Sequence, residues 1–307
     1  MRNSLGLRLH WPSLAISFSA VLWGTWWIPL RKLDSLGGGT IWLVALGVCL
    51  PALLFLPTFV LSGGRILRRG WPVLLCALFF GLSITFYAEG ALRGNVARVI
   101  LLFYLTPVWS TLLARLMLAE PITRERLVSI ALGLTGLWII LGDQSGSLIP
   151  RPRDLAEWMG LLAGLFWALA MVYVQKNRGA NIIEMAFPIL FCYAASFLLL
   201  TLIPGGRAWS TLPAIQWHEA IAWVVLIAVI WHIPTVLLSL YGAREVEPGR
   251  VAILLMLEVV IGVGSAAMLA NEPFGVREII GALFILSASL YEFVPGIFAD
   301  KTNFKKL

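Results

Sequence analysis

The chain has 307 residues, of which 60% are hydrophobic and only 13% charged, and its formal net charge is +7. A soluble domain is about half apolar and about a quarter charged. A core of this size cannot bury so many apolar residues, so the composition indicates a protein that sits in lipid. The basic residues lie in short stretches between apolar runs and form no basic arm or face. The positions of these basic residues therefore indicate that they orient the protein in a membrane and do not bind nucleic acid.

The first apolar run spans residues 13–30, after Arg2 and Arg8. No small-residue cleavage site closes this run, so we expect an uncleaved first membrane helix and not a signal peptide. Nine further runs are long and apolar enough to cross a membrane, which takes about 20 residues. These nine predicted spans are residues 40–61, 71–91, 96–118, 127–142, 156–175, 182–203, 220–241, 250–270 and 276–298.

The distribution of Lys and Arg predicts the orientation of these ten spans. With the N-terminus in the cytoplasm, 15 of the 23 basic residues fall on the cytoplasmic side and 8 on the other. Positive charge accumulates in cytoplasmic loops, so we expect both termini in the cytoplasm, in a bacterial cytoplasmic (inner) membrane. Arg98, Arg115 and Arg250 lie near helix ends, from which their side chains can reach the headgroups.

The chain contains an internal repeat. Residues 98–121 recur as residues 250–273, with Arg98 matching Arg250 and Glu120-Pro121 matching Glu272-Pro273 at one offset of 152 residues. Each half holds five predicted spans, and an odd number inserts the two halves in opposite directions. Inverted repeats are typical of secondary transporters, whose substrate site lies between the repeats near the membrane midplane. A duplication that serves only packing is the alternative.

The repeat divides the chain into four parts. We expect a first five-helix repeat at residues 1–142, a linker at 143–155, a second repeat at 156–298 and a basic cytoplasmic tail at 299–307. The expected fold is an all-α membrane protein of ten transmembrane helices in two inverted repeats.

Three segments carry a family resemblance: LWGTWW, NVARVILLFYLTPVWSTLLARLMLAEPIT and EPGRVAILLMLEVVIGVGSAAMLANEPFGVREIIGALFIL. They resemble the EamA-type drug/metabolite transporter superfamily, and the resemblance covers nearly the whole chain as two repeats. It implies transport of amino acids, nucleobases, cations or other metabolites. The first repeat keeps Pro107, whereas the second has Val259 where proline is frequent. We therefore expect a hinge in the fourth span more than in the ninth.

Charged residues inside apolar spans are the sharpest candidates for a site, because a charge at the bilayer centre costs at least about 2.5–3.5 kcal/mol. Glu258 lies about two turns into the ninth span, and Glu89 lies near the end of the third. Each is predicted to face a cavity and is a candidate proton carrier. The alternative is an ion pair or a carboxylate bonded to backbone.

Deep aromatic residues accompany these carboxylates. Aromatic walls with one carboxylate could hold an ammonium group or stack an aromatic solute, although simple packing is the alternative. His232 lies beside the kink expected at Pro234 and could titrate near neutral pH, or its ring could be satisfied by a freed carbonyl. The complete predicted substrate site is Trp23, Trp27, Tyr87, Glu89, Tyr104, Trp167, Trp231, His232 and Glu258.

The predicted function is secondary transport by alternating access of a small metabolite, either an amino-acid-like zwitterion or an organic cation. No phosphate-binding loop is present in the sequence, and the three cysteines and three histidines show no metal-ligand spacing. We therefore expect no ATP site, metal or cofactor. The expected partners are the substrate, the bilayer, and protons or another coupling ion. A membrane-embedded enzyme and a non-transporting scaffold are the alternatives; the enzyme would need clustered polar motifs that this sequence lacks.

Overall fold

A computed structural model describes residues 11–26, 28, 29, 32, 36, 41–93, 96–145, 152–201, 217–270 and 275–293, which are all-helical and contain no strand. Trp27, residues 146–151 of the linker and the basic tail lie outside these described residues. The helices are α1 (Trp11–Gly24), α3 (Ile41–Leu61), η2 (Arg65–Arg69), α4 (Trp71–Arg93), α5 (Val96–Phe103), α6 (Thr106–Leu118), α7 (Arg124–Ser145), α8 (Leu155–Lys176), α9 (Ile182–Thr201), α10 (Trp217–Leu226), η3 (Ile227–His232), α11 (Ile233–Glu245), α12 (Pro248–Leu255), α13 (Leu257–Ala270) and α14 (Val276–Phe293).

Six of the described helical segments are long and apolar enough to cross a membrane. Leu61, Leu116 and Met268 expose 88%, 79% and 84% of their surface on the outside of the bundle. Large apolar side chains tolerate such exposure when the surrounding solvent is lipid. The protein is therefore an integral membrane protein. The six segments are Trp71–Gly90, Arg98–Leu118, Leu155–Lys176, Ile182–Leu200, Trp217–Glu245 and Pro248–Leu269.

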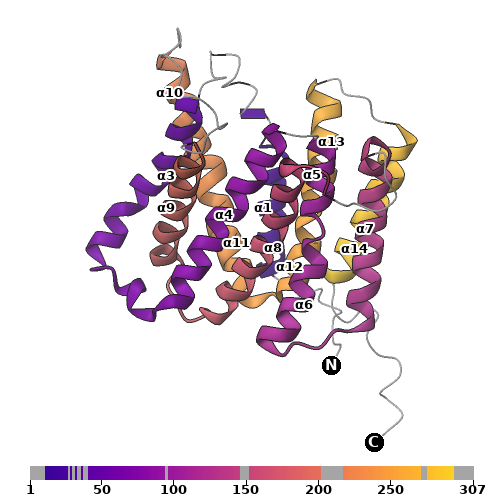
Figure 1. The fold of residues 1–307 in the computed structure, drawn as a ribbon, viewed down its shortest axis with the longest axis horizontal. Helices are drawn as coiled ribbons and strands as arrows, with labels where there is room; N and C mark the ends of the chain where they lie inside the picture. Colours follow the sequence, from indigo (N-terminus) through magenta and orange to yellow (C-terminus); the bar gives the residue numbers. More distant parts are fainter. Residues whose placement is uncertain are drawn as a thin grey trace, which may run out of the picture.

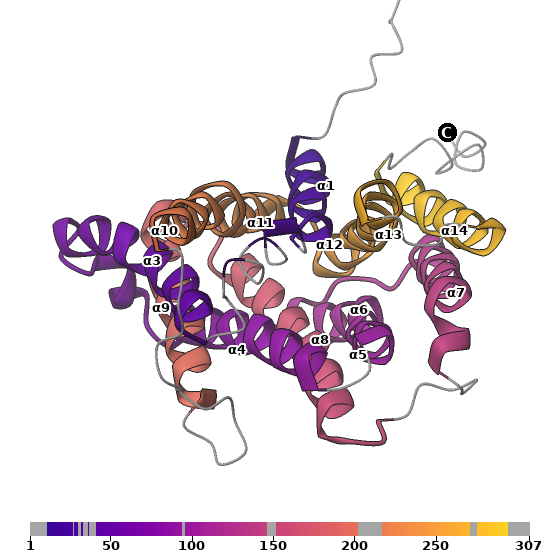
Figure 2. The ribbon, with the colours of Figure 1, turned by 90° about the horizontal axis from the view of Figure 1, so that it is seen from above.

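Helices from the two sequence halves interleave. Helix α4 lies against α8 and α9, and α7 lies against α14 at one edge of the bundle (Figures 1 and 2). Glycine permits these close contacts. A Cβ atom at Gly164 of α8 would overlap the carbonyl oxygen of Phe103, and one at Gly136 of α7 would overlap that of Gly281. Small residues let membrane helices approach closely enough for van der Waals packing, which holds such bundles together in lipid.

Two spans are interrupted at positions that are repeat mates. Helix α5 ends at Phe103 and α6 begins at Thr106, so the break includes Tyr104. Helix α12 ends at Leu255 and α13 begins at Leu257, so the second break falls at Met256, 152 residues after Tyr104. Pro107, in the first turn of α6, accounts for the expected first break because proline cannot donate a helical hydrogen bond. The second break occurs without a proline.

The eighth predicted span widens near its middle. Helix α10 passes into the π-helix η3, which ends at His232, and α11 follows with Pro234 in its first turn. The proline removes one helical donor, and a π-helical turn is one way to accommodate the gap. This turn replaces the simple kink expected at Pro234. It sets the side chain of His232 into the bundle, where only 5% of the residue is exposed.

Candidate functional site

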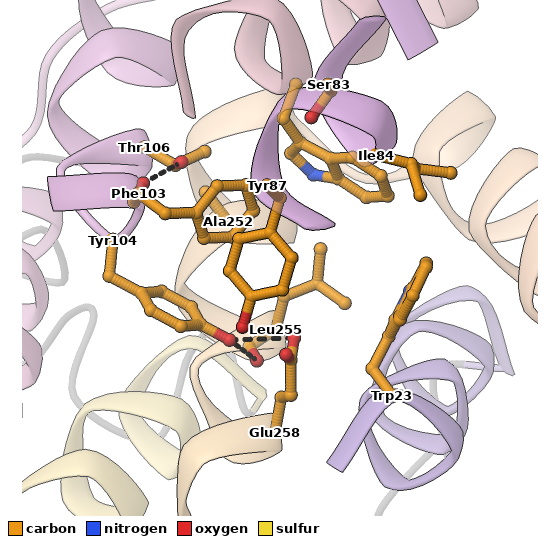
Figure 3. Close-up of a pocket in the computed structure, with 11 residues that line it drawn as sticks. Trp23, Ser83, Ile84, Tyr87, Phe103, Tyr104, Thr106, Ala252, Leu255 and Glu258 are labelled. Atoms are coloured by element: carbon orange, nitrogen blue, oxygen red, sulfur yellow. Dashed lines mark hydrogen bonds between the residues drawn. The ribbon is translucent and has the colours of Figure 1, made fainter. Parts of the chain in front are cut away.

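A central cavity of about 30 Å³ lies where α1, α4, α8 and both helix breaks meet. Figure 3 shows its wall, with Glu258 between the hydroxyl groups of Tyr87 and Tyr104 on one side and Trp23 on the other. A cavity needs roughly 10–15 Å³ to hold one water molecule, so this one has room for water but not for a metabolite. Its lining residues are Trp23, Ser83, Ile84, Tyr87, Phe103, Tyr104, Thr106, Trp167, Ala252, Leu255 and Glu258.

Glu258 supplies the only acidic side chain of the described cavity lining. It is the second residue of α13, directly after the break at Met256. Tyr104, from the break in the other half, donates its hydroxyl hydrogen to Glu258 Oε2 at 2.8 Å and lies 3.3 Å from the carbonyl oxygen of Leu255. The amides of the first helical turn also favour a carboxylate. The two breaks thus bring a carboxylate and a phenol together.

Aromatic rings surround this carboxylate. The ring centroids of Tyr87 and Phe103 are 4.8 Å apart, and those of Phe103 and Tyr104 are 5.1 Å apart. In Figure 3 the hydroxyl groups of Tyr87 and Tyr104 both point toward Glu258. Aromatic faces attract cations, most strongly when water is excluded. A carboxylate within aromatic walls is therefore suited to a positively charged or hydrogen-donating group.

The other polar groups of the cavity contribute few free hydrogens. Ser83 donates to the carbonyl oxygen of Ala163 at 2.8 Å, and Thr106 donates to that of Phe103. The indole N–H of Trp167 is buried and has no hydrogen-bond partner among the described residues. No Lys or Arg belongs to the described lining. The cavity therefore offers one carboxylate and no basic side chain.

A second, smaller chamber adjoins the first and shares Trp23 and Ile84 with it. Its volume is about 10 Å³. The ring of His232 lies 4.5 Å from that of Trp26 and 5.6 Å from that of Tyr193, measured between centroids. The chamber is lined by Leu22, Trp23, Trp26, Ile84, Leu190, Tyr193, Trp231, His232, Thr235 and Val236.

The hydrogen bonding of His232 determines whether its free ring nitrogen donates or accepts hydrogen bonds in the second chamber. Its Nδ1 lies 3.0 Å from the carbonyl oxygen of Gly47, which can only accept, so Nδ1 carries a hydrogen. Nε2 is buried and has no partner among the described residues. In the neutral ring, Nε2 then carries a lone pair and accepts hydrogen bonds. The second chamber therefore contains a hydrogen-bond acceptor, His232 Nε2, as the central cavity contains the Glu258 carboxylate.

The structure places seven of the nine predicted site residues around the two chambers. Trp231 and His232 line the second chamber, where the Trp231 indole donates to Thr25 Oγ1 at 3.3 Å. Glu89 lies outside both linings; it is buried and pairs with Arg93 at 3.0 Å. Trp27 is not among the described residues. The members of the central cavity are Trp23, Tyr87, Tyr104, Trp167 and Glu258.

Some lining residues were not predicted from the sequence. Phe103 and Thr106 flank the first helix break, so Pro107 was the signal that could have found them. Trp26 and Tyr193 belong to the second chamber. No local sequence pattern distinguishes them from the other aromatic residues of the spans, because their role depends on which helices face each other.

One buried ion pair links the two halves away from the cavity. Arg98 of α5 donates through Nε and Nη2 to both oxygens of Glu157 in α8, and the Nη2 contact measures 2.9 Å. The two side chains are 7% and 3% exposed. Asp154 caps α8 by accepting from the Glu157 amide at 2.9 Å, and the Arg153 amide donates to Glu157 Oε2 at 2.8 Å. Arg98 therefore holds α5 against α8. The expectation that its side chain reaches the headgroups is wrong, because the side chain pairs with Glu157 inside the bundle.

The fold and the cavity define an integral membrane protein with an enclosed aromatic and acidic site inside a helical bundle. A profile of the EamA-like transporter family matches residues 10–142 and again residues 154–291. The chain belongs to this family of transporters, which confirms the resemblance seen in its sequence.

Relatives named as transporters agree with this assignment, and a solved structure shares the fold. An uncharacterized transporter of Archaeoglobus fulgidus is 26% identical over 286 residues, covering 92% of this chain and 96% of the relative. An uncharacterized transporter of Helicobacter pylori is 23% identical over 195 residues, which is 63% of each chain. A crystal structure superposes with a TM-score of 0.69 at 19% identity, covering 91% of this chain and 95% of the other. This last likeness concerns the fold alone.

Proposed function

We propose that this protein is a secondary transporter that moves a small organic cation, such as a primary amine, across a bacterial inner membrane by alternating access. The observation that carries the proposal is the Glu258 carboxylate, held by Tyr104 inside aromatic walls with no Lys or Arg in the described lining. A buried charge without a partner is costly, so the site is suited to a ligand that supplies the positive charge.

The proposed architecture is ten spans in two inverted repeats, with both termini in the cytoplasm. Two observations support it. The family profile matches the chain twice, at residues 10–142 and 154–291. The helix breaks at Tyr104 and Met256 are separated by the offset of the sequence repeat. Inverted repeats supply two nearly equivalent end states, one open to each side of the membrane.

The central cavity is too small for a substrate, as expected for a closed state of a transport cycle. Pockets for small molecules measure about 300–1,000 Å³, far more than the central cavity has here. We infer that the helices around it separate to admit substrate. Trp23 and Ile84 line both chambers, so a movement of these two side chains would join the chambers into one larger site.

The lining favours an organic cation over an amino-acid-like zwitterion. Glu258 and His232 Nε2 are both acceptors in the inferred neutral state of the histidine, and a substrate ammonium or hydroxyl would donate to them. A substrate carboxylate would need a guanidinium or ammonium partner, and the described linings contain neither. We further propose that protons exchange with the substrate cation at Glu258, because the empty site also requires its charge to be neutralised.

Flux measured in proteoliposomes tests this function. The purified protein is reconstituted and assayed with a panel of labelled amines, zwitterions and organic anions, with and without an imposed pH gradient. We expect uptake of at least one amine, and faster uptake when the proton gradient drives protons out of the vesicles as the amine enters. Uptake should be lost in Glu258→Gln, which keeps the shape of the side chain and removes its charge. Glu125→Gln, at an exposed position at the start of α7, is the matched control and should transport normally.

The same assay separates the competing functions. A folded protein that moves none of the panel under any gradient would favour the scaffold. Conversion of a panel compound to a new product would favour the membrane enzyme. Uptake of zwitterions alone, unaffected by Glu258→Gln, would overturn the proposed role of the carboxylate.

A further inference from the structure

A third concave site, separate from the two chambers, lies between the start of α9 and the end of α11. It is an open groove of about 670 Å³ that shares no residue with either chamber. One wall comes from the turn before α9 and its first residues, including Gly179, Asn181 and Ile183. The other wall comes from α11 and includes Tyr241 and Arg244.

The groove lies at the boundary of the membrane. One candidate span begins at Ile182 and another ends at Glu245, so the residues of both walls stand where the apolar helices meet the headgroup layer. Tyr241 is 43% exposed and Ile183 is 45% exposed. Tyrosine is enriched at this level of the bilayer, where its ring faces lipid and its hydroxyl faces water.

The groove carries a positive charge, Arg244, for which the described residues supply no ion-pair partner. Arg244 is partly buried, and its Nε is a buried donor without a hydrogen-bond partner among the described residues. Among the ion pairs of the described residues, none joins Arg244 to its chain neighbour Glu245, and Glu184 of α9 pairs with Arg65 at 3.0 Å. A guanidinium that is partly removed from water is stabilised by an anion.

Two further features add positive potential at the same end. Arg69 donates through Nη2 to the carbonyl oxygen of Gly179, which brings a second guanidinium to the rim of the groove. Helix α9 is 20 residues long and its N-terminus opens onto the groove, with Asn181 Oδ1 accepting from the Ile183 amide at 2.9 Å. The N-terminus of a helix favours negative charge.

We propose that this groove binds an anionic phospholipid, with its phosphate against Arg244 and one acyl chain along Ile183 and Tyr241. The lining has two parts, a cationic end at the headgroup level and an apolar wall that faces the membrane. Basic pockets between transmembrane helices hold anionic headgroups, and the apolar wall distinguishes a lipid from a free anion. The bound lipid would join α9 to α11. The proposal does not depend on which solute the central cavity accepts.

Lipid-dependent stability of the purified full-length protein in detergent tests the proposal. Thermal unfolding is followed with added phosphatidylglycerol, phosphatidylcholine or inorganic phosphate, and native mass spectrometry counts the lipids retained. We expect phosphatidylglycerol to raise the unfolding temperature more than phosphatidylcholine does, and inorganic phosphate to have no effect. Arg244→Gln should weaken phosphatidylglycerol binding about tenfold, as expected for a lost charge-assisted contact.

Two further variants complete the design. Arg124→Gln removes the same charge from an exposed position at the start of α7, and should bind phosphatidylglycerol like the wild type. Ile183→Glu places a carboxylate in the groove at an exposed position, so it should fold and lose the preference for the anionic lipid even if Arg244→Gln does not fold. Equal responses to both lipids in the wild type, or an unchanged preference in Ile183→Glu, would overturn the proposal. Stabilisation by inorganic phosphate alone would assign the groove to a soluble anion instead.

Discussion

The hydroxyl of Tyr104 donates to the carboxylate of Glu258 at 2.8 Å, across 154 positions of the sequence. Each residue stands at an interruption of a membrane helix, one in each half of the chain. The bond therefore connects two segments that would have to separate if the halves move against each other. It is both a structural contact between the repeats and the polar centre of the proposed site.

Tyr104→Phe tests this contact without changing the size of the ring. A hydrogen bond to a charged group contributes about 1.5–3 kcal/mol, so we expect substrate affinity or transport efficiency to change by about tenfold or more. Uptake kinetics in proteoliposomes provide the measurement. Tyr173→Phe is the control, because Tyr173 is buried in α8 but lines neither chamber. Equal kinetics in both variants would show that the Tyr104 hydroxyl serves neither binding nor transport.

Substitutions of Arg98 and Glu157 should lower the free energy of unfolding by amounts that do not add up in the double variant. Removing one partner leaves a buried charge uncompensated, so Arg98→Gln and Glu157→Gln should each destabilise the protein by about 3–5 kcal/mol. The double variant should lose much less than the sum of the two. Equilibrium unfolding in mixed micelles, arranged as a double-mutant cycle, measures the coupling. Additive losses would show that the pair is energetically independent despite its geometry.

Gly164 and Gly264 offer a matched test of helix packing. A Cβ atom at Gly164 would overlap Phe103 O and Thr106 Oγ1, whereas nothing lies within 4 Å of one at Gly264. Gly164→Ala should therefore destabilise the protein by about 1–3 kcal/mol through overpacking. Gly264→Ala should be neutral or should stabilise α13 by up to about 1 kcal/mol. Thermal unfolding of both variants checks the contrast, and equal effects would contradict the close approach of α8 to the first helix break.

The proposed topology predicts the side of the membrane on which two fusion points lie. Ten spans with five in each half place a reporter after Asp143 and a reporter after Asp300 on opposite sides. Paired reporters, one active only in the cytoplasm and one only outside it, give complementary signals at each point. Signals on the same side for both points would exclude the inverted five-plus-five arrangement.

The sequence by itself determined the class of this protein. Apolar composition and long uncharged runs depend only on neighbouring residues, so they indicated an integral membrane protein and its helical fold without knowledge of any contact. The repeat at Arg98 and Arg250 and the family motifs indicated a transporter. The charged position Glu258 stood out because a carboxylate in an apolar span needs a special environment.

Only the tertiary structure decided which residues meet. It pairs Glu258 with Tyr104 and Glu89 with Arg93, although both glutamates looked alike as charges in apolar spans. It also breaks a helix at Met256, where no proline marks the position. The physical reason is that burial in lipid follows from local composition, whereas partners and breaks depend on helices brought together from distant parts of the chain.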